Sequence, residues 1–217
     1  MKKIEIHAFL HFIREKKFKN VAEIGVFGGN LAKRVVSDRI AKIDNYYCVN
    51  PWVPYIEEYD RVPGKNESKP EWWENIAQKV YKIQEDFPVI KIIRKRSVEG
   101  ALYLKSNEIF LDSVYIDAVH DGRNMVWDLF SWLPLVIDGG MIGGHDYTKA
   151  YPTMTKVLDE VFKEELNFIV INPEKPPLSY KNTGQGGNWW VWINDQNRKI
   201  FLERIEGNFQ KELGEIH

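Results

Sequence analysis

Two short stretches of the chain place histidine and aspartate side chains directly after apolar runs. "YIDAVHD" contains Asp117, His120 and Asp121, and "GGHDY" contains His145 and Asp146. Imidazole and carboxylate groups transfer protons near neutral pH, and they also bind divalent cations. The two stretches are therefore candidates for parts of one catalytic site, if the fold brings them together.

The elements that must position these residues follow from the pattern of the whole chain. Short apolar runs rich in β-branched residues alternate with segments whose apolar residues recur every three or four positions, which predicts strands alternating with helices. Such alternation is typical of an α/β fold with a Rossmann-like, doubly wound and mostly parallel sheet. The predicted strands are 20–26, 46–50, 88–95, 113–118, 140–147, 167–172 and 188–195.

The last two predicted strands are joined by "PEKPPLSYKNTGQGG", which has no helical periodicity. Parallel neighbours need a crossover connection, whereas antiparallel neighbours do not. We therefore expect the sheet to end in an antiparallel pair of strands at the C-terminal side.

Parallel strands end at the same edge of a sheet, and ligands of α/β folds bind there. Asp117, His120, His145 and Asp146 are thus expected to lie on one rim. Plain structural roles are the alternative: Asp146 could cap a turn, and His145 could be a hydrogen-bonded rim histidine. Asp121 precedes a helical pattern and is predicted to be the N-cap of that helix.

The bulk composition limits the class of protein. We expect one domain over residues 1–217, with an N-terminal helix over 1–18 and substrate loops at 51–73 and 173–187. A formal net charge of −1 gives no reason to expect nucleic-acid binding. No apolar run is long enough to span a membrane, and the single cysteine, Cys48, excludes an internal disulfide, so a cytoplasmic protein is expected.

The first strand runs into "AEIGVFGGNLA", a glycine-rich turn before a helix. Glycine backbone lets a ligand approach where a Cβ atom would collide. The dinucleotide fingerprint G-x-G-x-x-G is not met, because Phe27 stands where the second glycine belongs, and no phosphate-binding G-x-x-x-x-G-K-[ST] string occurs.

The spacing that the turn does meet is E-x-G-x-x-x-G, through Glu23, Gly25 and Gly29. With the later "GGHDY", this stretch resembles the class I S-adenosylmethionine-dependent methyltransferases, above all small bacterial O-methyltransferases with a similar fifth-strand motif. The resemblance covers about Val21 to Tyr147. It implies that Gly25 and Gly29 pack against the amino acid and ribose of the cofactor, and that Glu23 helps to orient the cofactor's amino group.

The resemblance extends to the second and third strand ends. "CVNPW" has Asn50 where the family usually has an acid that binds both ribose hydroxyls, and an amide forms a weaker, uncharged bond there. Trp52 is a candidate to stack on the cofactor or substrate, or else to anchor the loop. Ser97 and Val98 match the segment that contacts the adenine edge, although Ser97 is also a good helix N-cap.

The resemblance also assigns roles on the rim. It implies that Asp117 faces the cofactor, that His120 is the base for the acceptor hydroxyl, and that His145 is a further catalytic candidate. In related metal-using enzymes, acids at the positions of Asp117 and Asp146 hold a divalent cation such as Mg²⁺. A histidine at position 145 would favour a softer metal or none.

The function implied is S-adenosylmethionine-dependent O-methylation of a small-molecule or sugar hydroxyl. The alternatives are a nicotinamide-dependent oxidoreductase on a related fold and a non-catalytic protein that binds an adenosyl ligand. Each of these three functions is compatible with a homo-oligomer. Aromatic side chains suit a sugar or phenol acceptor, because they can stack on the face of its ring. The candidates are Trp52, Tyr55, Tyr59, Trp72, Trp73, Tyr180, Trp189 and Trp190. The alternative is that the two Trp-Trp pairs belong to the hydrophobic core.

Overall fold

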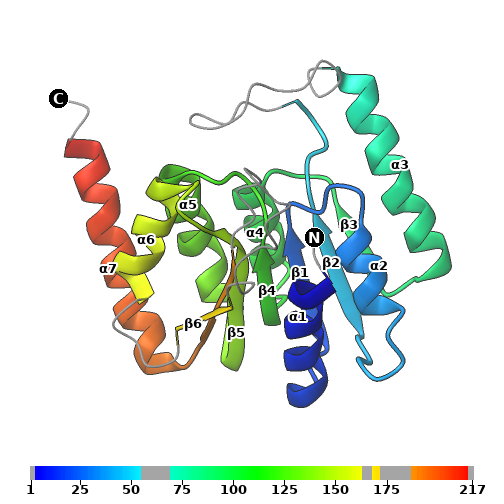
Figure 1. Cartoon of the computed structure of the whole chain (residues 1–217), viewed down its shortest axis with the longest axis horizontal. Helices are drawn as coiled ribbons and strands as arrows, with labels where there is room; N and C mark the ends of the chain where they lie inside the picture. Colours follow the sequence, from blue (N-terminus) through cyan, green and yellow to red (C-terminus); the bar gives the residue numbers. More distant parts are fainter. Residues whose placement is uncertain (1–2, 55–68, 163–167, 172–186, 215–217) are drawn as a thin grey trace, which may run out of the picture.

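The structure is a computed structural model, and it describes residues 3–54, 69–162, 168–171 and 187–214. Within these residues a single sheet has the strand order β3-β2-β1-β4-β5-β7-β6 (Figure 1). Its strands are β1 (Asn20–Ile24), β2 (Asn45–Val49), β3 (Ile90–Ile93), β4 (Leu111–Ile116), β5 (Val136–Tyr147), β6 (Ile169–Ile171) and β7 (Gly187–Trp192).

The first five strands pair in parallel, and β7 lies antiparallel between β5 and β6. This confirms the predicted Rossmann-like sheet with an antiparallel C-terminal strand pair. Each predicted apolar run overlaps one observed strand, because most residues of these strands are buried on both faces of the sheet and are apolar.

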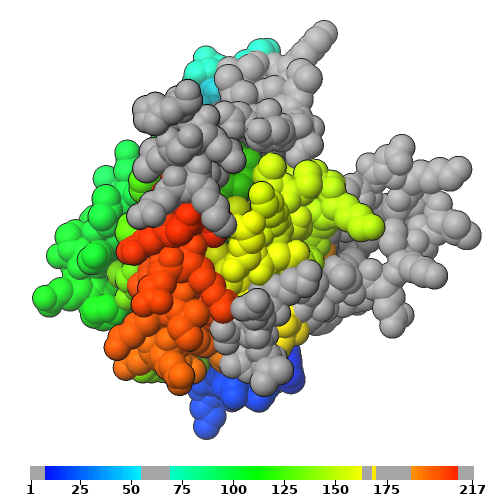
Figure 2. All heavy atoms as spheres, turned by 90° about the vertical axis from the view of Figure 1, so that its left-hand side faces the viewer, coloured from blue at the N-terminus to red at the C-terminus, as the bar shows by residue number. Residues whose placement is uncertain are grey.

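Helices cover both faces of the sheet. The residues buried with α1, α2 and α3 form one apolar layer, and those buried with the later helices form the other. Figure 2 shows α6 and α7 side by side at one end of the molecule. The helices are α1 (Lys3–Lys16), α2 (Asn30–Val36), α3 (Pro70–Asp86), α4 (Ser97–Ser106), α5 (Gly122–Trp132), α6 (Pro152–Phe162) and α7 (Asp195–Gly214), with a 3-10 turn at Leu133–Leu135.

The structure differs from the sequence prediction at the ends of the two expected loops. Residues 70–73 are the first turn of α3, where Pro70 fits because the first helical N–H needs no partner. Gly187 begins β7. The remaining described elements were expected, except for α7, which follows β7 directly. No helix in the described parts of the chain is long and apolar enough to cross a membrane.

The paired glycines of "GGHDY" make room for two tryptophans. Gly143 lies opposite Trp190 and Gly144 opposite Trp189 across the β5–β7 ladder. A Cβ atom at Gly143 would lie 2.0 Å from the Trp190 ring. Both tryptophans are completely buried, so the prediction that they could contact an acceptor is wrong, and their role is core packing.

Candidate active site

A cavity of about 620 Å³ opens at the carboxyl ends of the parallel strands, within the size range of small-molecule sites. It is bounded by the turn after β1, the end of β2, the start of α4, the end of β4 and the first turns of α5. Its described lining includes Gly25, Phe27, Asn50, Trp73, Ser97, Val98, Asp117, His120, Asn124, Trp127 and Asp128.

The turn after β1 lies against the end of β4 through backbone contacts. The Asp117 N–H donates to the Ile24 carbonyl at 2.7 Å, and the Gly25 N–H donates to the Val49 carbonyl at 3.0 Å. Gly25 has φ of 92°, and a Cβ atom there would lie 1.9 Å from the Asp117 carbonyl oxygen. Only glycine can bring the two strand ends this close.

The predicted rim residues converge. The Nε2 atom of His120 lies 3.3 Å from an Asp117 carboxylate oxygen and 3.2 Å from an Asp146 oxygen. The Nδ1 atom of His145 lies 3.0 Å from the other Asp146 oxygen and 3.8 Å from Asp117. Two imidazoles and two carboxylates from the ends of β4 and β5 therefore form one cluster. Asp117 and His120 line the cavity, whereas His145 and Asp146 are not part of its lining.

A bulge in β5 orients His145 and Asp146, the two members of the cluster that come from this strand. Gly144 pairs with Trp189 and Tyr147 with Gly187, so two residues of β5 face one residue of β7. Asp146, in the bulge, has φ of 60°, a conformation that costs an aspartate energy. Bulges and strained residues concentrate at functional sites, where they direct a side chain, and here the directed group is the carboxylate beside His120.

The electrostatics of the cluster keep Asp117 ionised. Desolvation in the site would raise the pKa of Asp117, but the hydrogen bond from His120 and the nearby His145 outweigh it, so the pKa lies below its usual value. The ring of Tyr151 stacks on His120 at 4.8 Å between centroids and fixes its plane.

Asp121, the third polar residue of "YIDAVHD", has a structural role. Its side chain accepts the Asn124 N–H at 2.8 Å and begins α5, which confirms the predicted N-cap. Ser97, by contrast, is not an N-cap: it is the first residue of α4, which Arg96 precedes, and its hydroxyl bonds to Asp128.

The sequence matches a known family in the region that builds this site. A family model described as a methyltransferase domain matches residues 22–147, from β1 to the end of β5. The chain belongs to this methyltransferase family. The resemblance predicted from the sequence is thereby confirmed, and the family is not one of nicotinamide-dependent oxidoreductases. No curated protein matches the sequence.

Solved structures agree with the fold of this methyltransferase. An O-methyltransferase from Bacillus cereus in complex with SAH has a TM-score of 0.61 at 12% identity, over 89% of this chain and 82% of that one. The O-methyltransferase TomG from Streptomyces achromogenes, in complex with SAM, has a TM-score of 0.60 at 12% identity, with coverages of 89% and 81%. An SAH-bound methyltransferase from Podospora anserina has a TM-score of 0.56 at 14% identity, with coverages of 90% and 80%.

Some of the predicted cofactor residues of this methyltransferase line the cavity, and others are not part of its lining. Gly25, Asn50, Ser97 and Val98 line the cavity, as does Asp117. The side-chain oxygen of Asn50 accepts the Trp52 N–H at 3.1 Å, so its amide N–H groups are what it can offer a ribose hydroxyl.

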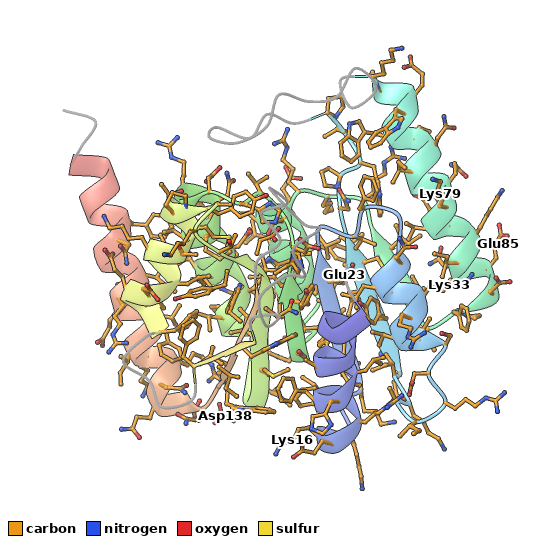
Figure 3. The ribbon with its side chains drawn as sticks, viewed as in Figure 1. Lys16, Glu23, Lys33, Lys79, Glu85 and Asp138 are labelled. Carbon is orange, nitrogen blue, oxygen red and sulfur yellow. The ribbon has the colours of Figure 1, made fainter. Side chains whose placement is uncertain are left out.

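Three predicted cofactor residues do not line the cavity. Trp52 is 1% exposed, and its indole N–H donates to the Phe27 carbonyl at 2.8 Å, so it anchors the first turn and does not stack on a ligand. Gly29 is the N-cap residue of α2, with φ of 75°, and it packs against α3. Glu23 is 3% exposed inside the sheet (Figure 3).

Glu23 is held by its neighbours beneath the first turn. The Tyr46 hydroxyl donates to its carboxyl group at 2.8 Å. Burial raises the pKa of Glu23 to about 8, with the Tyr46 hydrogen bond opposing and Asp117 adding to the rise. Glu23 is therefore protonated at neutral pH in the free protein, and it supports the turn from below.

We expect Glu23→Gln to change how stability depends on pH. The folded protein keeps the Glu23 proton up to a pKa of about 8, whereas the unfolded chain releases it near 4.5. The folded state binds more protons between these values, so its free energy of unfolding falls as pH rises. Between pH 5 and pH 8, the free energy of unfolding of the variant should rise by roughly 3 kcal/mol relative to that of wild type, as measured by urea unfolding.

Parallel pH profiles for the two proteins would contradict this protonation state. Tyr46→Phe is a useful companion, because it removes only the hydrogen bond that opposes the shift. It should leave the fall in stability with pH in place.

Several cavity residues were not predicted. Phe27 has φ of 40° and is 50% exposed, and Trp127 adds aromatic surface. Trp73, one of the aromatic residues suggested by the sequence, also lines the cavity. Asp128 left one signal in the sequence, an acid on the apolar face of a helix between Met125 and Trp132. Tyr55, Tyr59 and Tyr180 lie outside the described residues.

Proposed function

We propose that the protein transfers a methyl group from S-adenosylmethionine to a hydroxyl oxygen of a small molecule. The observation that carries this proposal is that one cavity contains both the glycine turn of the methyltransferase family and the Asp117–His120 pair. Two of the structural neighbours are O-methyltransferases with SAH or SAM bound, which supports the same class.

The residues of the cavity fit the cofactor. The Gly25 backbone permits close approach of its amino acid part, the Asn50 amide can donate to a ribose hydroxyl, and ionised Asp117 suits a cationic ligand. When bound, S-adenosylmethionine supplies a methyl group made electrophilic by its sulfonium.

His120 is the proposed base. The carboxylates beside Nε2 favour the tautomer that carries its proton there, which leaves Nδ1 to accept a proton. His120 takes the proton that the acceptor hydroxyl loses as its oxygen bonds to the methyl carbon and the carbon–sulfur bond breaks. The resulting imidazolium is stabilised by Asp117 and Asp146, and His145 extends this charge network.

The proposed acceptor is a sugar or a phenol. Phe27, Trp73 and Trp127 give the cavity aromatic walls, and such walls bind flat or weakly polar rings by stacking. A panel of phenols, catechols and sugars, analysed by mass spectrometry for methylated product and S-adenosylhomocysteine, tests this. A protein that binds the cofactor but methylates no member of the panel would instead be a binding module.

The same cluster could hold a divalent cation. Ligand atoms of Asp117, His120 and Asp146 all lie within 4.8 Å of one another. One imidazole with two carboxylates fits Mn²⁺ or another transition metal better than Mg²⁺, which prefers oxygen ligands. The cation would orient the acceptor oxygens. His120 would then be a metal ligand through Nε2, on the side that faces the carboxylates.

We expect turnover to survive removal of divalent cations. The reason is that His120 becomes an imidazolium between the two carboxylates as it accepts the proton, and so supplies the positive charge that a cation would add. Activity is measured after dialysis against EDTA, and again after addition of Mn²⁺ or Mg²⁺. Loss of activity that Mn²⁺ restores would contradict this prediction and would make Asp117, His120 and Asp146 the metal ligands.

A further inference from the structure

Three aromatic side chains form a continuous patch on the surface beside the cavity. The aromatic patch consists of Trp127 and Phe130 on α5 and Phe209 on α7, two helices that pack against each other. The rings of Trp127 and Phe209 meet edge to face at 4.5 Å between centroids, and those of Phe130 and Phe209 do so at 5.4 Å. Phe209 therefore joins the two rings of α5 into one apolar surface.

Water reaches this aromatic patch. Trp127 is 45% exposed and Phe130 is 38% exposed, while Phe209 is partly buried against the core. Single exposed apolar residues are common on soluble proteins, but contiguous apolar patches mark places where something binds. The aromatic patch is thus a candidate binding surface.

One member of the aromatic patch also belongs to the cavity. Trp127 lines the cavity together with His120, the proposed base. A molecule bound with its hydroxyl at His120 has Trp127 in the same wall, and the ring of Trp127 contacts Phe209 outside that wall. The apolar surface therefore continues from the cavity to the outside of the molecule.

The size of the aromatic patch argues against a second protein chain as its occupant. Each ring is less than half exposed, so the accessible area of the three is on the order of 300 Å². Each partner in a stable protein complex buries roughly 800 Å². A short hydrocarbon chain, by contrast, covers an area of this size.

We propose that the methyl acceptor carries an apolar tail, which leaves the cavity over Trp127 and lies on Phe130 and Phe209. This rests on the proposed function, in which the sugar or phenol ring of the acceptor lies in the cavity with its hydroxyl at His120. The substrate class is then an amphiphile, in which the ring that is methylated is joined to an alkyl or aryl chain. Trp127, Phe130 and Phe209 are specificity-determining residues for that chain.

Two series of compounds with growing alkyl chains test this inference. They are ethylphenol, butylphenol and hexylphenol, each with its chain para to the hydroxyl, and ethyl, butyl and hexyl glucoside. Calorimetry measures their affinity for the complex of the protein with S-adenosylhomocysteine, so the readout does not require turnover. A fully buried CH₂ contributes about fourfold in affinity, and the aromatic patch leaves one side of the chain in water, so we expect about twofold per CH₂.

The ratio of hexyl to ethyl affinity is the quantity to compare between variants. In wild type it should reach about tenfold or more in at least one series, and Trp127→Ala and Phe209→Ala should each reduce it to less than about threefold. Phe110→Ala is the matched control, because Phe110 is 54% exposed but precedes β4, at the amino ends of the parallel strands. This variant should keep the wild-type ratio.

Three results would overturn the inference while leaving the proposed function intact. They are equal affinities along both series in wild type, a wild-type ratio kept in both Trp127→Ala and Phe209→Ala, and a dimer in analytical ultracentrifugation that Phe209→Ala dissociates. The last result would assign the aromatic patch to a second copy of the chain. Failure of wild type to bind S-adenosylhomocysteine would instead remove the proposed function, and the inference with it. The wild-type ratio does not depend on how any variant folds.

Discussion

Replacing His120 by glutamine should lower turnover by about 10²- to 10⁴-fold, the usual contribution of a general base. The affinity for S-adenosylhomocysteine should change little, because glutamine keeps the size and polarity of the ring and removes only its basicity. Turnover of wild type should rise with pH as the imidazole loses its proton, and the variant should lack this rise. Initial rates across pH, with the best acceptor from the panel, measure both effects.

The matched control for this substitution is His11→Gln. His11 lies on α1 with its side chain 69% exposed and pairs with Glu15, so its loss should leave turnover unchanged. The turnover of an Asp146→Asn variant should lie between those of His120→Gln and His11→Gln, since the substitution removes one carboxylate from His120 and leaves the other. Full turnover in His120→Gln would show that another group accepts the proton.

Gly25→Ala should abolish cofactor binding. The added Cβ atom would lie 1.9 Å from the backbone oxygen of Asp117, and φ of 92° is unfavourable for alanine. The backbone cannot move aside without separating β1 from β4, so the cost should be on the order of 3 kcal/mol or more. Thermal unfolding and calorimetry with S-adenosylhomocysteine measure the two consequences.

Gly28→Ala is the control for this variant within the same turn. A Cβ atom at Gly28 would have no heavy atom within 4 Å, so stability should change by less than about 0.5 kcal/mol. Equal effects of the two substitutions would contradict the close approach of the first turn to the end of β4. Normal binding by Gly25→Ala would contradict it as well.

Much of the fold could be predicted because its signals are local. Buried parallel strands read as apolar runs, and amphipathic helices show their spacing, so sheet and helix segments followed from short windows. The convergence of the site residues at one edge of the sheet could also be predicted, since Asp117 and His145 stand at the ends of neighbouring strands. The N-cap role of Asp121 depends only on the three residues after it.

What could not be predicted depends on partners far apart in sequence. The acceptor role for Trp190 failed because its partner is Gly143, on a strand 47 residues earlier, and the pairing buries the ring. Trp52 turned inward to bond the Phe27 carbonyl, 25 residues away. Glu23 was expected at the cofactor but bonds Tyr46 on the neighbouring strand.

Helix α7 was missed for a different reason. Among its described side chains only Phe201 and Ile205, four residues apart, are fully buried, and most of its sequence is polar or charged. A helix that buries a narrow stripe gives a weak periodic signal. Asp128 was missed because an acid on an apolar helix face is uncommon, and its hydrogen-bond partner, Ser97, belongs to another helix.

The most direct measurement is a calorimetric titration of the purified protein with S-adenosylmethionine, with NAD and the Gly25→Ala variant in parallel. We predict saturable binding of one S-adenosylmethionine per chain to wild type, no binding of NAD, and none of either ligand to the variant. A folded wild type that gives no heat with millimolar S-adenosylmethionine, or that binds NAD in its place, would contradict the assignment of the cavity to a methyl donor.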